Sequence, residues 1–284
     1  MGYSARALAR RLHAQGWRIT GSTTREDGLA RITEAGWDGV LFDGTSHGGA
    51  ALHEAIATTT HLVVSAAPDE RGDPVLRQLA GHIAMADNIC WIGYLSTIGV
   101  YGDAAGAWID ETAALKPTSQ RSRQRADAEQ ARLDFGHTSD ARIQIFRLAG
   151  IYGPGRSAID NLRDGSARRI IKPGQVFNRI HVDDIAGALM AAIAAPKAPH
   201  AIYNVTDDEP APPQDVVAHA AGLLGLAVPP DIPFEQAPLS PMGLSFYAEN
   251  KRVSNARLKA DLSYVFKYPT YREGMAAIAA LPGV

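Results

Sequence analysis

The stretch PVLRQLAGHIAMADNICWIGYLS, residues 74–96, joins two hydrophobic patterns of different period. In its first half, Leu76, Leu79 and Ile83 recur at three- and four-residue spacing, which predicts an amphipathic helix. The short continuous apolar run at 89–96 is typical of a strand buried on both faces. A helix that leads into a buried strand is the repeating unit of a parallel sheet covered by helices, so this stretch predicts an α/β fold.

The same alternation continues along the chain. Apolar β-rich runs are separated by Ala-, Leu- and Arg-rich segments with helical spacing. The predicted strands are residues 17–20, 40–42, 61–65, 89–96, 143–148 and 201–205. Because parallel strands are joined by right-handed crossovers, we predict a doubly wound parallel sheet with helices on both faces.

Turn residues become frequent after about residue 150, which indicates a smaller C-terminal portion. A hairpin is predicted around Pro173 and Gly174, and helices are predicted at 183–195, 213–224 and 271–280.

Composition excludes several classes of protein. The 284 residues are 46% hydrophobic, which is enough for a sizeable core, and carry a formal net charge of -2. Without a basic excess, nucleic acid is not an expected partner. No stretch approaches the ~20 apolar residues that span a bilayer, so no membrane partner is expected. The N-terminus lacks the apolar segment of a signal peptide, and we expect a cytoplasmic protein.

The chain has a single cysteine, Cys90, and nine scattered histidines. One cysteine forms no internal disulfide and no Cys-rich zinc site, and no His-x-x-x-His spacing occurs. We therefore predict no metal site. Cys90 lies in the apolar run at 89–96, where a buried strand position is expected.

The first residues resemble the end of a dinucleotide-binding turn, G-x-G-x-x-G/A, that runs into its helix. Gly2 takes the second glycine position and Ala5 the third, so Gly2, Tyr3, Ser4 and Ala5 are predicted to bind a cofactor pyrophosphate at the helix N-terminus. The alternative is an ordinary helix with Ser4 as N-cap. In the first interpretation the first glycine and the first strand precede Met1, so the sheet is expected to lack that strand in the sequence given.

The end of the next predicted strand bears on the choice of cofactor. The segment ITGSTTR, residues 19–25, has no acidic residue to bind a ribose 2′-hydroxyl. Thr24 and Arg25 are predicted to bind a 2′-phosphate instead, which favours NADP, with NAD as the alternative. Arg25 as an exposed residue that begins the next helix is an equally weighted interpretation.

Two further strand ends are candidates for cofactor contacts. Asp43 is placed to approach the adenine, or else forms a turn before Gly44. The small residues Ala66, Ala67 and Pro68 follow another strand and let backbone pass close to a ligand.

Four segments carry motifs in a fixed order: LSTIGVYG (95–102), RLAGIYGPGR (147–156), NRIHVDDIA (178–186) and YNVTD (203–207). Together they resemble the extended short-chain dehydrogenases/reductases, the NAD(P)-dependent epimerase/dehydratase group, over nearly the whole chain. The resemblance implies an NAD(P)-binding Rossmann domain, predicted here at 1–153 with 178–206 returning to the sheet. It also implies a smaller substrate-binding domain, predicted at 154–177 and 207–284, that often holds a nucleotide-sugar.

The family uses a Ser or Thr, a Tyr and a Lys for catalysis, and Thr97 falls on the hydroxyl position. The Tyr-x-x-x-Lys pair is missing, because Arg121 and Arg125 stand at the two positions that precede Glu129 by eight and four residues. The chain is similar in this to an atypical, YeeZ-like subgroup. Arginine stays protonated and cannot shuttle the proton, so the usual mechanism does not carry over. Arg121 and Arg125 either bind an anion in the cleft or form a solvated helix face.

Other residues are candidates for substrate contacts. Tyr152, Arg156, Arg179 and His181 lie in motifs that touch substrate in the family. His181 is a candidate replacement acid/base, although a structural hydrogen bond is the favoured interpretation. Tyr101 and Tyr152 are alternative proton donors. Asp183 and Asp184 begin a predicted helix, and we predict that they cap it.

These observations leave two functions open. The first is an NAD(P)-dependent oxidoreductase or epimerase/dehydratase-like enzyme with an atypical site, which acts on a nucleotide-sugar or a small polar metabolite. The second is a catalytically silent NAD(P)-binding sensor or regulator, which the missing Tyr/Lys pair favours. The helices predicted at 74–88 and 120–135 are candidates for a four-helix homodimer interface, which is common in the family.

Overall fold

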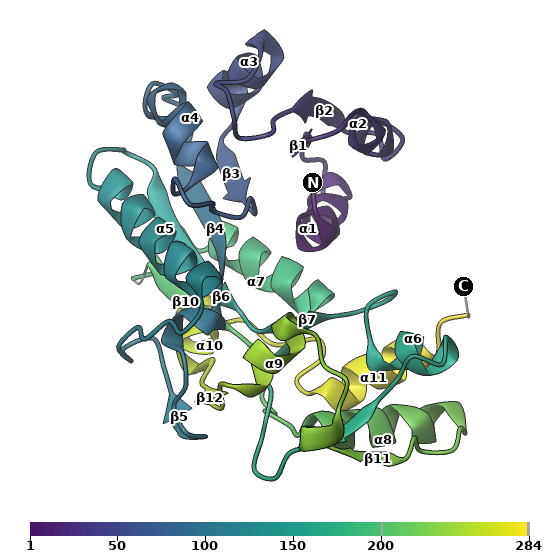
Figure 1. Cartoon of the computed structure of the whole chain (residues 1–284). Helices are drawn as coiled ribbons and strands as arrows, with labels where there is room; N and C mark the ends of the chain where they lie inside the picture. The colour runs from purple at the N-terminus through teal and green to yellow at the C-terminus, as the bar shows by residue number, and fades with distance from the viewer. Residues whose placement is uncertain (200, 283–284) are drawn as a thin grey trace.

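The computed structural model describes residues 1–199 and 201–282 (Figure 1). Its strands are β1 (Thr20–Thr23), β2 (Asp38–Leu41), β3 (His61–Val64), β4 (Trp91–Thr97), β5 (Trp108–Ile109), β6 (Arg142–Leu148), β7 (Gly150–Tyr152), β8 (Arg169–Ile171), β9 (Arg179–His181), β10 (Ile202–Val205), β11 (Asp231–Pro233) and β12 (Arg252–Val253). Its α-helices are α1 (Tyr3–His13), α2 (Glu26–Thr33), α3 (Ala50–Thr58), α4 (Pro74–Ala84), α5 (Gln120–Gly136), α6 (Ala158–Arg163), α7 (Val182–Ala194), α8 (Pro213–Leu224), α9 (Pro241–Tyr247), α10 (Ala256–Leu262) and α11 (Tyr271–Ala279). A 3₁₀ turn, η1 (Ile98–Tyr101), follows β4, and a second, η2 (Phe234–Gln236), follows β11.

The main sheet has four parallel strands in the order β10-β6-β4-β3. Its longest ladder joins β4 to β6 from the pair Trp91 and Arg142 to the pair Thr97 and Leu148. Helices cover both faces, with α4 and α5 on one and α7 on the other (Figure 1). The predicted α/β architecture with a parallel sheet is confirmed.

The strands β1 and β2 form a parallel ladder of their own. Among residues 1–199 and 201–282, no ladder joins β1 to β3, and Figure 1 shows the two-stranded unit set apart from β3. The unit is connected to the main sheet by α1, which packs along α7. Buried Leu8 and Leu12 of α1 share one hydrophobic cluster with Ile185 and Leu189 of α7.

Two clusters form the core on the two faces of the main sheet. The first packs α1, α7 and α10 against residues such as Phe146 and Tyr203. The second packs α3, α4 and α5 against Ile92 and Ile143. The pattern in residues 74–96 explains the second, because Leu79 and Ile83 are the inner face of α4 and β4 is buried along nearly its whole length.

A third cluster lies in the lower part of Figure 1, where α6, α8 and α11 pack together. The hairpin predicted around Pro173 and Gly174 is wrong. The turn exists, with Gly174 at φ +76°, but β8 pairs in parallel with β11 and β9 pairs in parallel with β7. Residues 252–262 pack beneath the main sheet, which the predicted boundary at 207 does not anticipate.

Two smaller expectations also differ from the structure. Cys90 is exposed just before β4, with its Sγ atom 3.7 Å from Nε2 of His61. The first strand in the chain begins at Thr20, three residues after Trp17. The apolar Trp17 that suggested the earlier start packs against the core cluster from the connection between α1 and β1. No helix in the described part of the chain is long and apolar enough to cross a membrane.

Candidate functional site

The predicted cofactor residues lie at the start of α1 and after the carboxyl ends of several strands. In a parallel sheet, ligands bind in the crevice outside the carboxyl ends of the strands. The N-terminus of α1 lies next to β1, because the amino group of Met1 donates to the carbonyl of Ser22. The end of β3 before Ala66 and the end of β4 at Thr97 lie at the carboxyl edge of the main sheet. The structure therefore brings the start of α1 to the end of β1, and the end of β3 to that of β4.

The N-terminus of α1 is open. Its N-cap is Gly2, in extended conformation and without a side-chain hydrogen bond, and its first turn holds no acidic residue. Ser4 lies inside the helix and is buried, so the alternative interpretation of Ser4 as N-cap is wrong. The first N–H groups of a helix lack intrahelical partners and carry a partial positive charge, which suits an anion. Tyr3 Oη donates to the carbonyl of Pro154 at 3.0 Å, which joins this helix end to the loop after β7.

Arg25 follows β1 and is the N-cap residue of α2. Its Nε atom lies 3.3 Å from Oδ1 of Asp27, and 72% of its side chain is exposed. An exposed pair of this kind is weak, so the guanidinium is free to turn toward a ligand. Thr24 is exposed beside it.

The other predicted cofactor contacts are surface loops. Asp43 accepts hydrogen bonds from the backbone N–H and the hydroxyl of Thr45, each at 2.8 Å, which forms the turn after β2. These bonds lower the pKa of Asp43. Ala66, Ala67 and Pro68 continue β3 into a loop in which Ala67 is exposed.

The two arginines at the Tyr and Lys positions differ in their surroundings. Arg121 is exposed in the first turn of α5, whereas Arg125 is buried one turn later. Nη1 of Arg125 donates to Tyr94 Oη at 3.1 Å and to the carbonyl of Leu95 at 2.9 Å. Arg125 therefore ties α5 to β4, and Arg121 is the one that faces solvent.

Thr97 is the half-buried last residue of β4. Its Oγ1 atom accepts a hydrogen bond from the N–H of Gly99 at 3.1 Å and caps η1. This matches the backbone role that a strand-end Thr commonly has, and it leaves the hydroxyl proton free to be donated elsewhere.

A buried polar network lies beneath this site and is not anticipated by the motifs. Arg147 of β6 pairs with Glu129 of α5, with Nη2 2.7 Å from Oε2. Nη1 of Arg147 donates to Tyr101 Oη at 2.8 Å, and Tyr101 donates to Oδ1 of Asn204 at 2.8 Å. The hydroxyl of Ser96 donates to Oε1 of Glu129. The network connects β4, β6, β10 and α5 through fully satisfied charges.

The alternative proton donors are held in buried positions. Tyr101 is occupied by Arg147 and Asn204, and burial raises its pKa. Tyr152 packs under α11, its hydroxyl 3.4 Å from the carbonyl of Thr270, and burial raises its pKa as well. Neither phenol is placed to exchange protons with a ligand at the end of β4.

His181 caps a helix. Its Nδ1 atom accepts a hydrogen bond from the N–H of Asp183 at 3.1 Å, and its ring packs between Tyr152 and Tyr268. Burial lowers its pKa to about 4, so the imidazole is neutral at physiological pH. The favoured interpretation, a structural hydrogen bond, is confirmed.

The predicted capping by Asp183 and Asp184 is wrong, because His181 takes the N-cap position. Asp184 is fully buried and accepts hydrogen bonds from the hydroxyl of Tyr264 and the backbone N–H groups of Lys267 and Tyr268. It therefore fastens the segment before α11 to the start of α7.

Arg179 and Arg156 have different surroundings. Nη1 of Arg179 donates to the carbonyls of Phe177 and Ala211, both at 3.0 Å, which ties two segments of the lower part together. Arg156 is exposed in the loop after β7. Of the arginines predicted to bind an anion or the substrate, Arg121 and Arg156 are thus the exposed ones, and Arg125 and Arg179 are held by protein groups.

Asp207, two residues after the end of β10, is a buried carboxyl near Arg179. It is 1% exposed, and within the described residues its Oδ2 atom has no hydrogen-bond partner. Burial raises its pKa to about 8. At pH values between the ordinary pKa of 3.8 and about 8, the folded protein holds a proton on Asp207 that the unfolded chain has released. The contribution of this carboxyl to the free energy of unfolding is therefore complete at low pH and is lost as pH rises through about 8.

The substitution Asp207→Asn is expected to flatten the dependence of stability on pH. Relative to the variant, the wild type should lose up to about 1.4 kcal/mol of unfolding free energy per pH unit between roughly pH 5 and 8. Urea denaturation at a series of pH values measures the difference. Asp127→Asn, which alters an exposed carboxylate of α5, is the control. Parallel pH profiles of wild type and Asp207→Asn would contradict the prediction.

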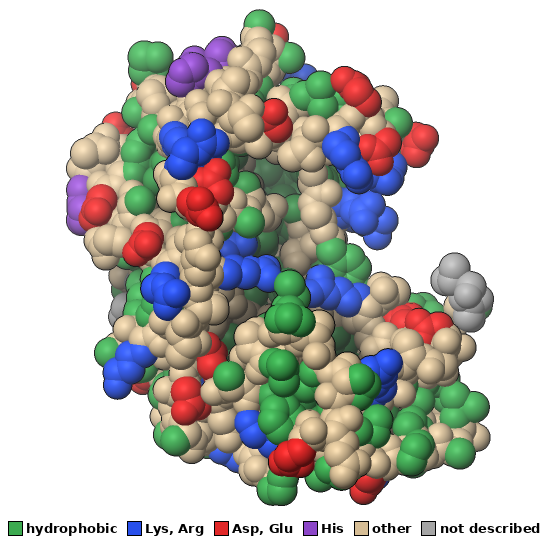
Figure 2. All heavy atoms as spheres, in the orientation of Figure 1, with side chains coloured by type: hydrophobic (Ala, Val, Ile, Leu, Met, Phe, Trp, Pro, Cys, Tyr) green, Lys and Arg blue, Asp and Glu red, His purple; other side chains and the backbone are tan. Residues whose placement is uncertain are grey.

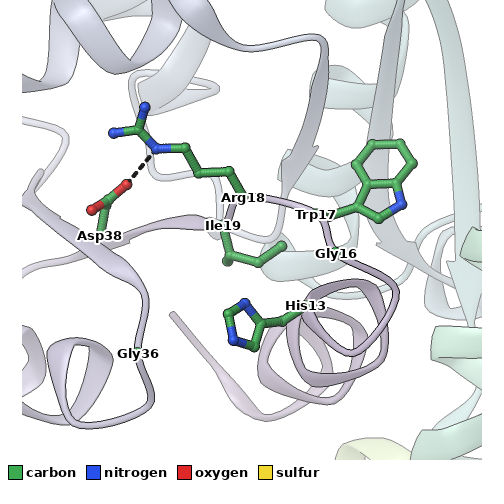
Figure 3. A pocket seen from close by; sticks show the side chains of 7 residues that line it. All are labelled: His13, Gly16, Trp17, Arg18, Ile19, Gly36 and Asp38. Carbon is green, nitrogen blue, oxygen red and sulfur yellow. Dashed lines mark hydrogen bonds and ion pairs between the residues drawn. The ribbon is translucent and has the colours of Figure 1, made fainter.

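The structure also has a hollow of about 330 Å³ at the opposite edge (Figure 3). It is lined by His13 and Gly16 at the end of α1, by Arg18 and Ile19 before β1, and by Asp38 at the start of β2. Arg18 closes one side through an ion pair with Asp38 at 2.8 Å. Because these residues lie at the amino ends of the strands, the hollow is separate from the candidate site.

No group of three or more His, Cys, Asp or Glu side chains within the described ranges is arranged to hold a metal ion.

Comparison with known proteins agrees with this geometry. The model of the NAD dependent epimerase/dehydratase family matches residues 1–206. Protein YeeZ of Escherichia coli K12 is 28% identical over 291 residues, which cover 95% of this chain and 94% of YeeZ. A functionally unknown conserved protein from Silicibacter pomeroyi is 50% identical, with a TM-score of 0.87 over 98% of this chain and 95% of that one.

A more distant structure shares the fold alone. MoeE5, in complex with UDP-glucose and NAD, is 18% identical and superposes with a TM-score of 0.76 over 98% of this chain and 94% of its own. With a family model that matches most of its length, and with the helix end and strand ends of a Rossmann fold in place, this chain belongs to the NAD dependent epimerase/dehydratase family.

Proposed function

We propose that this protein binds NADP(H) and acts as an oxidoreductase or epimerase/dehydratase with an atypical active site. One observation carries the proposal: the open, positive end of α1 lies at the carboxyl edge of the strands, with Arg25 at the end of β1. No carboxylate occupies the first turn of α1 or residues 20–25. This donor set fits a pyrophosphate and a second phosphate, and disfavours the ribose hydroxyl contact typical of NAD.

In the proposed complex, Gly2, Tyr3, Ser4 and Ala5 bind the pyrophosphate through the start of α1. Thr24 and Arg25 bind the 2′-phosphate. Two strand-end loops complete the cofactor contacts, with Asp43 near the adenine and Ala66, Ala67 and Pro68 lining the nicotinamide half. When bound, the nicotinamide supplies or accepts a hydride.

On the substrate side, we propose that Thr97 donates its hydroxyl proton to a substrate oxygen. Arg121 and Arg156, the exposed arginines, bind anionic groups of the substrate. Arg125 positions the end of β4, while Tyr152, Arg179 and His181 shape the substrate portion from buried places. A nucleotide-sugar or a small polar metabolite is the proposed substrate class, and the UDP-glucose held by the similarly folded MoeE5 supports the former.

The substitution Arg25→Ala tests the choice of cofactor. Removing a charge-assisted contact worth about 1.5–3 kcal/mol should weaken NADPH binding roughly 10- to 100-fold. NADH lacks the 2′-phosphate, so its affinity should change less than about twofold. Titration of the reduced nucleotides by fluorescence measures both. Arg18→Ala, an exposed arginine at the opposite edge, is the control. Equal effects on the two nucleotides would reject the 2′-phosphate role, and failure of both to bind the wild type would reject the proposed function.

A second function, a catalytically silent NAD(P) sensor, is favoured by a specific observation. The side chains that were candidates for proton transfer, Tyr101, Tyr152 and His181, are all buried and bonded to protein groups. Nucleotide binding without oxidation of the reduced nicotinamide by any nucleotide-sugar or carbonyl compound in a panel would favour the sensor over the enzyme.

We further propose that the protein is cytoplasmic and forms a homodimer through α4 and α5. The two helices cover the same face of the sheet (Figure 1). Within the described ranges, Met85, just after α4, is exposed, and no large hydrophobic residue inside either helix is exposed. The outer surface of the two helices is therefore largely polar.

A further inference from the structure

The short helix α9 exposes apolar side chains on the outside of the protein. Met242, Leu244 and Phe246 are 59%, 48% and 60% exposed. Met242 and Phe246 are four residues apart and share one face of the helix. Exposed apolar groups that lie together mark surfaces that bind a ligand or a partner, because the free energy falls when each group is removed from water.

Contacts of its C-terminal end hold α9 in place. Tyr247 packs edge-on against Phe177 and, tilted, against Phe234, with ring centroids 5.1 Å apart in both cases. Lys172 donates to the carbonyl of Tyr247. The exposed residues are therefore presented by a fixed helix rather than by a free loop.

The residues after α9 reach the start of α5. Glu249 Oε1 accepts a hydrogen bond from the hydroxyl of Thr118 at 2.5 Å, and Asp103 Oδ1 accepts one from the N–H of Asn250 at 2.7 Å. Thr118 is three residues before Arg121, and Glu249 is three residues after Phe246. This hydrogen bond brings the segment that leads into α5, which carries Arg121, next to the segment that follows α9.

Arg121 has no ion-pair partner within 4.0 Å among residues 1–199 and 201–282, so its charge is available to a ligand. Figure 2 shows hydrophobic side chains gathered over α9 at the lower rim of a hollow, with Lys and Arg side chains directly above them. An apolar face beside an unpaired cation is complementary to a small molecule that has an apolar body and an anionic group.

We propose that the substrate cleft takes a small aromatic carboxylate, whose ring lies on Met242 and Phe246 and whose carboxylate binds Arg121. This inference rests on the proposed function and selects the second of its two substrate classes, the small polar metabolite, on the grounds of the side chains at this place. A sugar ring is less suitable at this place, because its hydroxyls would be removed from water against apolar side chains without hydrogen-bond partners.

Binding to the full chain tests the proposal, with cinnamate as the probe, by titration calorimetry with and without saturating NADPH. Cinnamamide, which has the same ring and no charge, and UDP-glucose are the comparison ligands. Cinnamate should bind more tightly than either. The pair Met242→Ser/Phe246→Ser and the single Arg121→Gln should each weaken cinnamate about tenfold or more. Val265→Ser, which alters a residue 85% exposed outside α9, is the matched control and should leave binding unchanged.

Several outcomes overturn the inference. These are no cinnamate binding, binding that the α9 pair leaves unchanged, and a preference for UDP-glucose that depends on α9. A change from dimer to monomer in the α9 pair, seen by sedimentation, would assign this face to a second copy instead. NADPH is titrated separately, so loss of cinnamate binding with NADPH binding intact rejects this inference alone, whereas absence of NADPH binding rejects the proposed function.

Discussion

Replacing Arg147 with Met is expected to lower the free energy of unfolding by about 3–5 kcal/mol. The Arg147 and Glu129 side chains are 4% and 2% exposed, so the substitution leaves a buried carboxylate without its cation. The hydroxyl of Tyr101 also loses the hydrogen bond that it accepts from Arg147. A buried charge that loses its partner pays the cost of desolvation without the compensating attraction.

The double substitution Arg147→Met/Glu129→Leu separates this explanation from loss of packing. With both charges removed, most of the lost stability should return, because an apolar pair of similar volume often replaces a buried ion pair without penalty. Chemical denaturation of the single and double variants measures the difference. The control is Arg272→Met, which breaks the exposed pair between Arg272 and Glu209 and should cost no more than about 1 kcal/mol. A double variant as unstable as the single one would contradict the explanation.

Gly102→Ala should destabilise the protein by about 3 kcal/mol or more. Gly102 ends η1 at φ +69° and ψ -148°, a region that is populated essentially by glycine and costs an L-residue about 1–3 kcal/mol. A Cβ atom there would lie 1.9 Å from the carbonyl oxygen of Lys116, which is backbone and cannot rotate away. The chain would have to shift where η1 meets the segment before α5, which adds a strain term of about 1–3 kcal/mol.

Gly81→Ala is the matched comparison and should have the opposite sign. Gly81 is exposed inside α4, and a Cβ atom at this position meets nothing within 4 Å. Alanine in a helix interior is favoured over glycine by about 0.5–1 kcal/mol, so thermal unfolding should move slightly upward. A Gly102→Ala variant with unchanged stability would show that η1 adapts without strain.

The fold could be predicted from the sequence because its signals are local. The buried strands at 91–97 and 142–148 are rich in apolar and β-branched residues, and the helix α4 before the first of them repeats apolar residues at helical spacing. The hairpin that was predicted around Gly174 is absent, although the turn itself is present. Its strand β8 pairs with β11, about sixty residues later, and no local pattern specifies a pairing of that kind.

The candidate site was predicted less well, for a physical reason. Arg121 and Arg125 lie four residues apart on one helix, and the sequence treats them alike. The helix α5 carries few apolar residues to mark its inner face, so the position of the sheet edge relative to its first turn decides which arginine is buried. Arg147 did give a signal, because a charge between the apolar residues Phe146 and Leu148 near the end of a buried strand requires a buried partner. The sequence could not say that Glu129 is that partner.

The packing of α1 along α7 has a consequence for the linkage between binding and folding. Leu8 and Leu12 of α1 share one hydrophobic cluster with Ile185 and Leu189 of α7, so α1 is held by side chains alone on that face. The same helix presents its open end at Gly2. An anion bound at that end would therefore be thermodynamically linked to the docking of α1 on α7. Part of the binding free energy of the anion would appear as slower hydrogen exchange along the backbone of α1.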